Sequence, residues 1–277
     1  MRQLRLCFVL LCVFWLFWSW TAVKLYREPR SITSSPSVKM LPPFRIETEA
    51  KNQLFTSCRT PNTVALTFTG GPSSNATWIG VRKLLKRRVP ATFFMHGDAA
   101  TRPKNQKLVQ FIDRQPLLMI GSASFDDLCL CDFTSKEKVE QQIEMGFEAL
   151  YNLTGKRYRH VRRPTHEPDR FGVLETGHWS LAVDGYTFDS NDQMWVENAY
   201  QNNFLSRNEM VRYVAQNIIK TLDTQLHTEH DKVRGGIIEL HDEKLVYLGL
   251  GKLIEFIESL NLSFVRMDQC TGMRETF

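Results

Sequence analysis

Two hydrophobic patterns alternate along most of the chain. Short apolar runs bounded by turn residues are typical of buried strands, and longer segments with apolar side chains three or four positions apart are typical of amphipathic helices. The predicted strands are residues 64–68, 89–95, 117–122, 235–240 and 263–267. The predicted helices are residues 75–88, 104–115, 134–155, 207–225 and 247–259. Strands that alternate with helices predict an α/β domain built on a parallel sheet or a barrel.

The N-terminus has a different pattern, an uninterrupted stretch of uncharged and mostly apolar residues from Leu6 to Val23. Its length is near the lower limit for a helix that crosses a bilayer. Trp18 and Trp20 occupy the region where a signal-peptide cleavage site needs small residues, and tryptophan favours the membrane–water interface. We therefore predict a membrane signal-anchor at residues 1–24, with a removed signal peptide and secretion as the alternative.

The rest of the chain divides by composition. Residues 25–54 are rich in serine, proline and charge and are predicted to form a stalk. A single folded domain is predicted at residues 55–272, followed by a short tail at residues 273–277. The formal net charge of +5 is far from that of a typical nucleic-acid-binding protein, so we expect no nucleic acid partner.

Glycosylation sequons and cysteines favour an oxidising compartment, with the domain in the secretory lumen or outside the cell. The acceptor residues of the three sequons are Asn75, Asn152 and Asn261. The cysteines of the predicted domain are Cys58, Cys129, Cys131 and Cys270, an even number. Spacing leaves their connectivity open, but a bond between Cys129 and Cys131 is not expected, because residues so close in sequence would be bridged only with strain.

The strand at residues 64–68 breaks into a turn at Gly70-Gly71-Pro72. The end of a strand is a common place for catalytic groups. Here the turn carries Thr69 and two glycines, without an acid, a base or a metal ligand. The chain thus has the platform of an active site without evident chemistry on it.

Five segments together resemble the NodB-homology polysaccharide deacetylases, carbohydrate esterase family four. CRTPNTVALTFTGGP (58–72) is similar to the segment around the family motif T-F-D-D-G-P, and VPATFFMHG (89–97) matches the next strand. RHVRRPTHE (159–167) resembles the R-P-P-Y-G motif, LHD (240–242) the last motif, and FVRMDQCTG (264–272) the terminal strand of fungal-type members. The resemblance implies a distorted (β/α) barrel that removes acetyl groups from polymers such as chitin or peptidoglycan with zinc or another divalent metal.

The departures from the family pattern lie in the chemistry. The resemblance assigns the general base to Thr69 and the metal ligands to Gly70, Ala123 and Asp127, where the family has aspartates and histidines. A catalytic metal needs about three protein ligands, and here only Asp127 offers one. A threonine hydroxyl does not take up a proton at physiological pH. We therefore predict no metal cofactor and no metal-dependent hydrolysis.

Other family positions are retained. The resemblance implies that Arg162 orients the base, that Leu240 walls the acetyl pocket and that His241 is the general acid. It places Trp195 and Tyr186, with neighbouring aromatic residues, in the loops of the polysaccharide groove.

The predicted function follows from this mixture of loss and retention. We expect a membrane-anchored, lumenal or extracellular domain without metal-dependent hydrolase activity that keeps a carbohydrate-binding or structural role, with an N-acetylated polysaccharide such as chitin as its partner. An active deacetylase with a rebuilt site, for which His166, Glu167 and Asp189 are candidates, is one alternative, and a non-catalytic partner of an active relative is another. The resemblance also implies a Cys58–Cys270 disulfide, because the first and last strands of a barrel are neighbours.

Overall fold

The computed structural model describes residues 53–164, 170–173, 181–182, 188–189, 206–226, 236–273 and 275–276. All of them belong to one unit, Ile46–Phe277. The predicted signal-anchor at residues 1–24 and nearly all of the predicted stalk lie outside the described residues. Among the helices that the structure does describe, none combines the length and the apolar character needed to span a bilayer.

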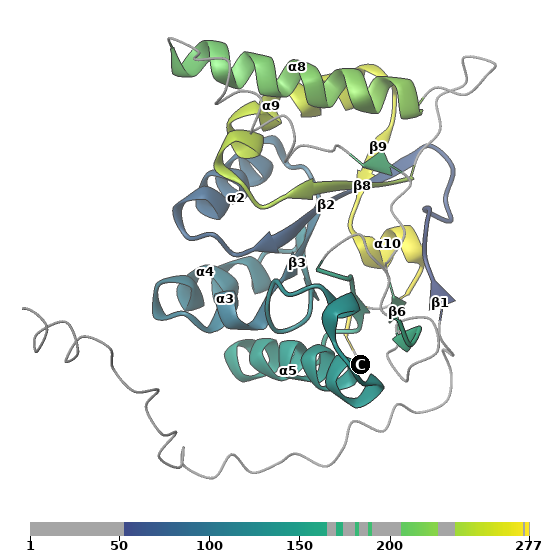
Figure 1. Ribbon diagram of the computed structural model, residues 1–277. Coiled ribbons are helices and arrows are strands. Elements are labelled where there is room, and N and C mark those ends of the chain that lie inside the picture. Colours follow the sequence, from purple (N-terminus) through teal and green to yellow (C-terminus); the bar gives the residue numbers. More distant parts are fainter. Residues whose placement is uncertain are drawn as a thin grey trace, which may run out of the picture. The chain divides into compact units, whose positions relative to one another are not determined.

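In the described residues nine strands form one sheet whose named pairs are all parallel (Figure 1). The strand order is β1-β6-β5-β4-β3-β2-β8-β7, and β9 also pairs with β2. The strands are β1 (Gln53–Leu54), β2 (Thr63–Gly71), β3 (Ala91–Met95), β4 (Leu118–Ser122), β5 (His160–Val161), β6 (Leu181–Ala182), β7 (Phe188–Asp189), β8 (Gly236–His241) and β9 (Ser263–Val265). The predicted α/β class with a parallel sheet is confirmed.

Helices cover this sheet on its outer side, and α10 lies on the other side (Figure 1). The helices of the described residues are α2 (Asn75–Arg87), α3 (Gly97–Thr101), α4 (Pro103–Asp113), the 3₁₀ helix η1 (Leu130–Asp132), α5 (Lys136–Thr154), α8 (Arg207–Leu226), α9 (Lys244–Ser259) and α10 (Met267–Thr271). Helix α9 packs against both α2 and α8, and α5 packs against α3 and α4. All five predicted helices are present, whereas the short α3 and α10 were not predicted.

The central strand β2 contributes side chains to two separate apolar clusters, one on each face of the sheet. Its side chains alternate between the two faces of the sheet, as the pleat of a strand requires. Val64, Leu66 and Phe68 are buried in the main core with apolar side chains of α2, α4, α8 and α9. Ala65 belongs to a second cluster, with Phe94, Ile237 and Met267, on what we call the inner face of the sheet. Thr67 and Thr69 follow Ala65 on this inner face.

The structure corrects several predicted boundaries. Strand β2 continues beyond Phe68 to Gly71, because Thr69 pairs with both β3 and β8. The strand predicted at 263–267 ends at Val265, because the main-chain N–H of Arg266 bonds to the Gln269 side chain and α10 begins.

Both predicted limits of the domain also move outward. Strand β1 lies within the predicted stalk and pairs with β6. The predicted tail at residues 273–277 contributes Glu275, whose carbonyl accepts a hydrogen bond from the Arg159 N–H at 3.1 Å, and Thr276, which bridges to Tyr158. The domain therefore includes residues that the composition assigned to a linker and a tail.

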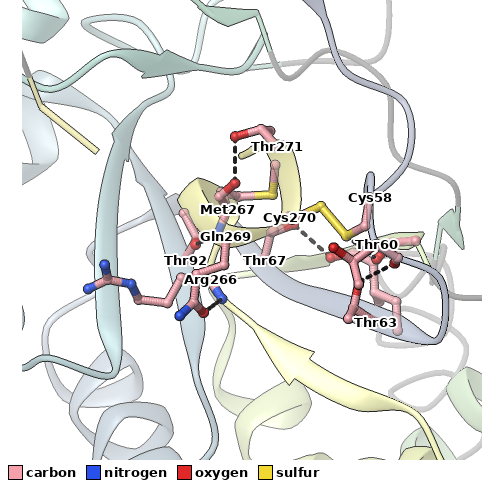
Figure 2. Close-up of a disulfide and its surroundings, with 12 residues drawn as sticks. Cys58, Thr60, Thr63, Thr67, Thr92, Arg266, Met267, Gln269, Cys270 and Thr271 are labelled. Atoms are coloured by element: carbon pink, nitrogen blue, oxygen red, sulfur yellow. Dashed lines mark hydrogen bonds between the residues drawn. A yellow bond between two sulfur atoms is a disulfide. The ribbon is translucent and has the colours of Figure 1, made fainter. Parts of the chain in front are cut away.

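A disulfide joins Cys58 to Cys270 on α10, as predicted (Figure 2). Their Cα atoms are 4.4 Å apart, and the Arg59 N–H donates to the Cys270 carbonyl at 2.8 Å. The pairing of β9 with the first half of β2 brings α10 to this place. A second disulfide joins Cys129 to Cys131, contrary to the prediction. Extended backbone at Cys129 separates the two Cα atoms by 5.1 Å, which lies inside the range that a disulfide spans, so the short spacing is no obstacle.

Candidate functional site

The carboxyl ends of β4, β3, β2 and β8 meet at one edge of the sheet. Thr69 on β2 is in register with Phe94 on β3 and with His241 on β8. Ala123 follows β4 directly, and its N–H donates to the Met95 carbonyl at the end of β3 at 2.8 Å. The fold therefore brings together strand ends that carry Thr69, Ala123 and His241, all of them predicted site residues.

The buried Arg162 side chain bonds to Thr69 on the inner face. Its Nη1 donates to the Thr69 hydroxyl at 3.0 Å and to the Thr67 hydroxyl at 2.7 Å. The guanidinium carbon also lies 4.4 Å from the centre of the Phe94 ring. Both Arg162 and Thr69 are only 2% exposed, so this pair is fixed within the domain. The arginine thus contacts the position that the resemblance assigns to the base, but finds a hydroxyl there.

Glu239 is a site residue that sequence reasoning missed. Its Oε1 lies 3.8 Å from the Arg162 Nη1, and both side chains are buried. Alternation along β8 places Glu239 on the inner face with His241, which follows two positions later. The available signal was a single charged residue inside the apolar strand GGIIEL, since a buried carboxylate is costly without a cationic partner. Arg162 thus has a carboxylate beside it that comes from the neighbouring strand.

His96 and Asp127 form a second polar pair, and His96 was not predicted. The His96 ring is 2% exposed, and its Nδ1 lies 2.8 Å from the Ala123 carbonyl oxygen. A carbonyl only accepts, so Nδ1 carries a proton and donates it. The other ring nitrogen, Nε2, lies 3.3 Å from the Asp127 Oδ1. The hydrogen bond with His96 lowers the pKa of the Asp127 carboxyl; burial opposes this, and the charges of His96 and His241 add to it.

His96 and Asp127 border a cavity of about 350 Å³. Gly70, His96 and Asp127 line one part of it, and Ser74, Lys104 and Asn105 are among its other lining residues. Among the residues that the structure describes, no group of three or more histidine, cysteine, aspartate or glutamate side chains could hold a metal ion. The divalent metal that the fold family implies does not fit these residues, because Gly70 and Ala123 have no donor and only His96 and Asp127 remain.

Two glycines shape the end of β2. Gly70 has a φ of +99°, which side chains rarely adopt, and a Cβ there would lie 3.9 Å from the His96 Nε2. A Cβ on Gly71 would overlap the Asp242 carboxylate, at 1.7 Å from Oδ2. Gly70 is therefore required by its backbone conformation, and Gly71 by its close neighbour.

Asp242 ties this turn to the following helix. Its carboxylate accepts hydrogen bonds from the Thr77 hydroxyl at 2.8 Å and from the Ser73 hydroxyl at 2.9 Å. Burial raises the pKa of Asp242, and the hydrogen bonds from Thr77 and Ser73 oppose this rise. Asp242 thus anchors the turn that follows Thr69 and Gly70.

A sequence model of the polysaccharide deacetylase family matches residues 56–170, which include β2, β3, β4 and Arg162. The parallel fold and the arginine at the strand ends agree with this match. Residues 56–170 thus have the sequence pattern of a polysaccharide deacetylase.

Solved structures of deacetylases share the fold. The chitin deacetylase of the fungal pathogen Colletotrichum lindemuthianum is 21% identical with a TM-score of 0.64, and the match covers 81% of this chain and 93% of that one. The Bc1960 peptidoglycan N-acetylglucosamine deacetylase is 18% identical with a TM-score of 0.62, covering 82% and 96%. BA3943, a CE4 family pseudoenzyme from Bacillus anthracis, is 14% identical with a TM-score of 0.59, covering 76% and 65%. No curated protein sequence matches the chain.

One predicted role is corrected by the structure. Leu240 was expected to wall the acetyl pocket, but its side chain points away from the inner face and is fully buried in the main core. The alternation of β8 explains this, because Glu239 and His241 occupy the face that Leu240 does not. His241 lies at the end of β8 and is half-buried, close enough to Asp127 to influence its pKa.

Only some of the remaining predicted residues lie in the part of the chain that the structure describes. Trp195, Tyr186, His166 and Glu167 lie outside the described residues. Asp189 lies on β7, in register with Glu239. The asparagines of the three sequons, Asn75, Asn152 and Asn261, are all exposed, so their side chains are accessible for attachment of a glycan. Glycosylation itself stays a prediction.

Proposed function

We propose that this deacetylase-like domain binds an N-acetylated polysaccharide such as chitin and does not hydrolyse it by the metal-dependent route. The observation that carries the proposal is the set of residues at the strand ends. Thr69, Gly70 and Ala123 supply no base and no ligand there, while Arg162 and the surrounding frame are retained.

The chemistry supports loss of hydrolysis. Amide hydrolysis needs an activated water and a stabilised oxyanion, and a metal with three protein ligands and an open position supplies both. His96 and Asp127 would leave such a metal one ligand short. Nor does the Thr69 hydroxyl replace the base, because it already accepts a hydrogen bond from Arg162 and stays protonated at neutral pH.

Binding places fewer demands on these residues than catalysis does. The cavity is bordered by hydroxyl, amide and charged groups of Ser74, Asn105, Lys104 and Asp127, which are suited to a polar ligand. The structural neighbours include a chitin deacetylase and a peptidoglycan N-acetylglucosamine deacetylase, which suggests the same class of polymer. A CE4 family pseudoenzyme with this fold, of which a mutant has restored enzymatic activity, is a precedent for a fold that outlives its chemistry.

The location of the domain is part of the proposal. The apolar residues 6–23 are proposed to anchor the chain in a membrane, with the domain in the secretory lumen or outside the cell. Two disulfides in the domain suit an oxidising compartment.

The deciding experiment measures metal, hydrolysis and binding on the full chain purified in detergent. Zinc and other metals are quantified by mass spectrometry, acetate release is followed on N-acetylchitooligosaccharides, and binding of the same oligomers is measured by calorimetry. Glycan binding without metal or acetate supports the proposal, and stoichiometric metal or acetate release refutes it. A Trp195→Ala variant should weaken binding, and Trp78→Ala is its control, because Trp78 packs against Phe111 in the outer layer.

A rebuilt active site is the second candidate, favoured by the pairing of His96 with Asp127 beside the cavity. If acetate release is observed without metal, Asp127→Asn and His96→Gln should each abolish it. If the chain neither binds glycan nor releases acetate, the role of a non-catalytic partner of an active relative gains support.

A further inference from the structure

We propose that the Cys129–Cys131 disulfide is a redox-active site that exchanges with dithiols, whereas the Cys58–Cys270 disulfide is structural. This inference does not depend on the proposed function. It rests on the accessibility of the two bonds, on the length of chain that each bond encloses, and on the groups that contact the sulfur atoms.

Accessibility differs between the two bonds. Cys129 and Cys131 are both half-buried at the surface of the loop that follows Asp127. Between them, Leu130 is only 2% exposed and packs with Val139 and Ile143 of α5 in a separate apolar cluster. The buried leucine holds the loop to the domain while both sulfur atoms stay near its surface. Cys270 on α10, in contrast, is fully buried, and only its half-buried partner Cys58 is accessible to an external thiolate, so one of the two sulfur atoms of that bond is shielded.

The two disulfides enclose chain segments of very different length, so their reduction should affect the stability of the fold differently. The sequence separation is 2 for Cys129–Cys131 and 212 for Cys58–Cys270. A cross-link restricts the unfolded chain roughly as the 1.5 power of loop length, so the longer loop restricts it on the order of a thousandfold more. Opening the short loop therefore changes the folding equilibrium little, and the site can be reduced and reoxidised within a folded domain.

The contacts of the two sulfur atoms differ and give the exchange a direction. The Cys131 N–H donates to the Cys129 Sγ at 3.2 Å, which stabilises negative charge on that sulfur. Cys129 is thus the better leaving group, and the incoming thiolate attacks the Cys131 Sγ. The S–S bond breaks, its electron pair stays on Cys129, and Cys129 takes a proton from water. The second thiolate of the reductant then attacks the mixed disulfide and releases Cys131, so the dithiol is oxidised to a disulfide as the protein gains two thiols.

Charge around the site selects among reductants. Asp132 Oδ1 lies 3.7 Å from the attacked Cys131 Sγ, and Asp126 and Asp127 lie in the same loop. Carboxylates repel an approaching anion, so a dithiol whose only charge is its attacking thiolate should react more readily than glutathione, which carries additional negative charge. The exposed Leu128 beside Cys129 offers an apolar contact for a dithiol carried by a protein.

Graded reduction of the full chain tests the proposal. The chain is treated with increasing dithiothreitol, free thiols are alkylated, and each cysteine is quantified by peptide mass spectrometry while circular dichroism reports the fold. We expect Cys129 and Cys131 to be alkylated at least tenfold faster than Cys58 and Cys270, with an unchanged spectrum and full reoxidation. Equal rates, or reduction of Cys129–Cys131 only as the fold is lost, would overturn the proposal.

Two further measurements test the direction and the charge selection. Trapping with a monothiol should place the mixed disulfide on Cys131, and a mixed disulfide found mainly on Cys129 would contradict the assigned leaving group. Asp132→Asn should speed reduction by glutathione several-fold more than reduction by dithiothreitol, because glutathione carries negative charge beyond that of its attacking thiolate. Lys136→Gln is the control for a change of charge in the next exposed segment, where we expect no gain.

Discussion

Restoring the family's residues at the strand ends should destabilise this domain before it restores a metal site. The perturbation is Thr69→Asp, Gly70→Asp, Ala123→His and Asp127→His in one chain. Gly70 has a φ of +99°, and a non-glycine residue held in such a conformation costs about 1–3 kcal/mol. Ala123 is fully buried, and a larger side chain forced into a packed core costs about 1–3 kcal/mol.

Together these two changes should lower the free energy of unfolding by about 2–6 kcal/mol in the absence of metal, a large share of the stability of a typical domain. Urea denaturation followed by circular dichroism measures the loss, with and without added zinc. If the new ligands bind zinc, a concentration of about 100 times the dissociation constant recovers about 2.7 kcal/mol. Recovery by zinc would support the alignment of these positions with the ligands of the family.

Simpler variants separate the backbone effect from the ligand effect. Gly70→Ala should destabilise the domain by about 1–3 kcal/mol, because it introduces only the backbone strain. Gly251→Ala is the matched control, since Gly251 lies within α9, where a Cβ would have ordinary space and alanine favours the helix. A quadruple variant as stable as the natural chain without metal would refute this reasoning.

Three further predictions concern the frame of the domain. Cys58→Ala with Cys270→Ala should lower the free energy of unfolding by up to about 5 kcal/mol, because the bond encloses most of the domain, and urea denaturation measures it. Glu239→Gln should cost about 3 kcal/mol in the same assay, because it removes a buried carboxylate beside Arg162. His160 has its pKa lowered to about 3 by burial, so the unfolded chain takes up a proton below pH 6.5 while the folded chain does not. Stability should therefore fall with falling pH between 6.5 and 3, at up to about 1.4 kcal/mol per pH unit, and His160→Gln should flatten this slope.

Controls for these predictions come from the same chain. Removing Cys129 and Cys131 together should cost much less than removing the other pair, and equal losses would contradict the dependence on loop length. Glu258→Gln changes an exposed carboxylate and should leave the free energy of unfolding unchanged. A loss equal to that of Glu239→Gln would contradict the explanation of the Glu239 effect by burial. An unchanged acid slope in His160→Gln would show that other groups control the acid response.

The elements of the fold could be predicted because each produces a periodic pattern of apolar residues. Residues 75–88 and 134–155, for example, place apolar side chains on one face, and both form helices close to those limits. The first and last residues of an element depend on single contacts, which leave no periodic pattern in the sequence. Arg266 begins α10 through a hydrogen bond with Gln269, and Glu275 bonds back to Arg159, so the last strand was predicted too long and the domain too short.

The site could be predicted only where a motif marks it. Arg162 was found through its motif, and the structure places it in contact with Thr69, while its role stays a prediction. Glu239 and His96 belong to no degenerate motif position, and their importance comes from neighbours on other strands. The error at Leu240 has the same origin, because a motif gives the residue but the pleat of β8 decides which face it occupies.

The frame of the site is held by contacts between protein groups that do not involve a metal. Arg162 is bonded to two threonine hydroxyls and lies beside Glu239, so its charge is accommodated although the aspartate of the family is absent. His96 is fixed by the Ala123 carbonyl and Asp242 by Thr77, each through hydrogen bonds within the domain. The packing around the cavity is therefore separate from the side chains at the positions that the resemblance assigns to the metal ligands. This separation is what allows a binding role to be tested independently of catalysis.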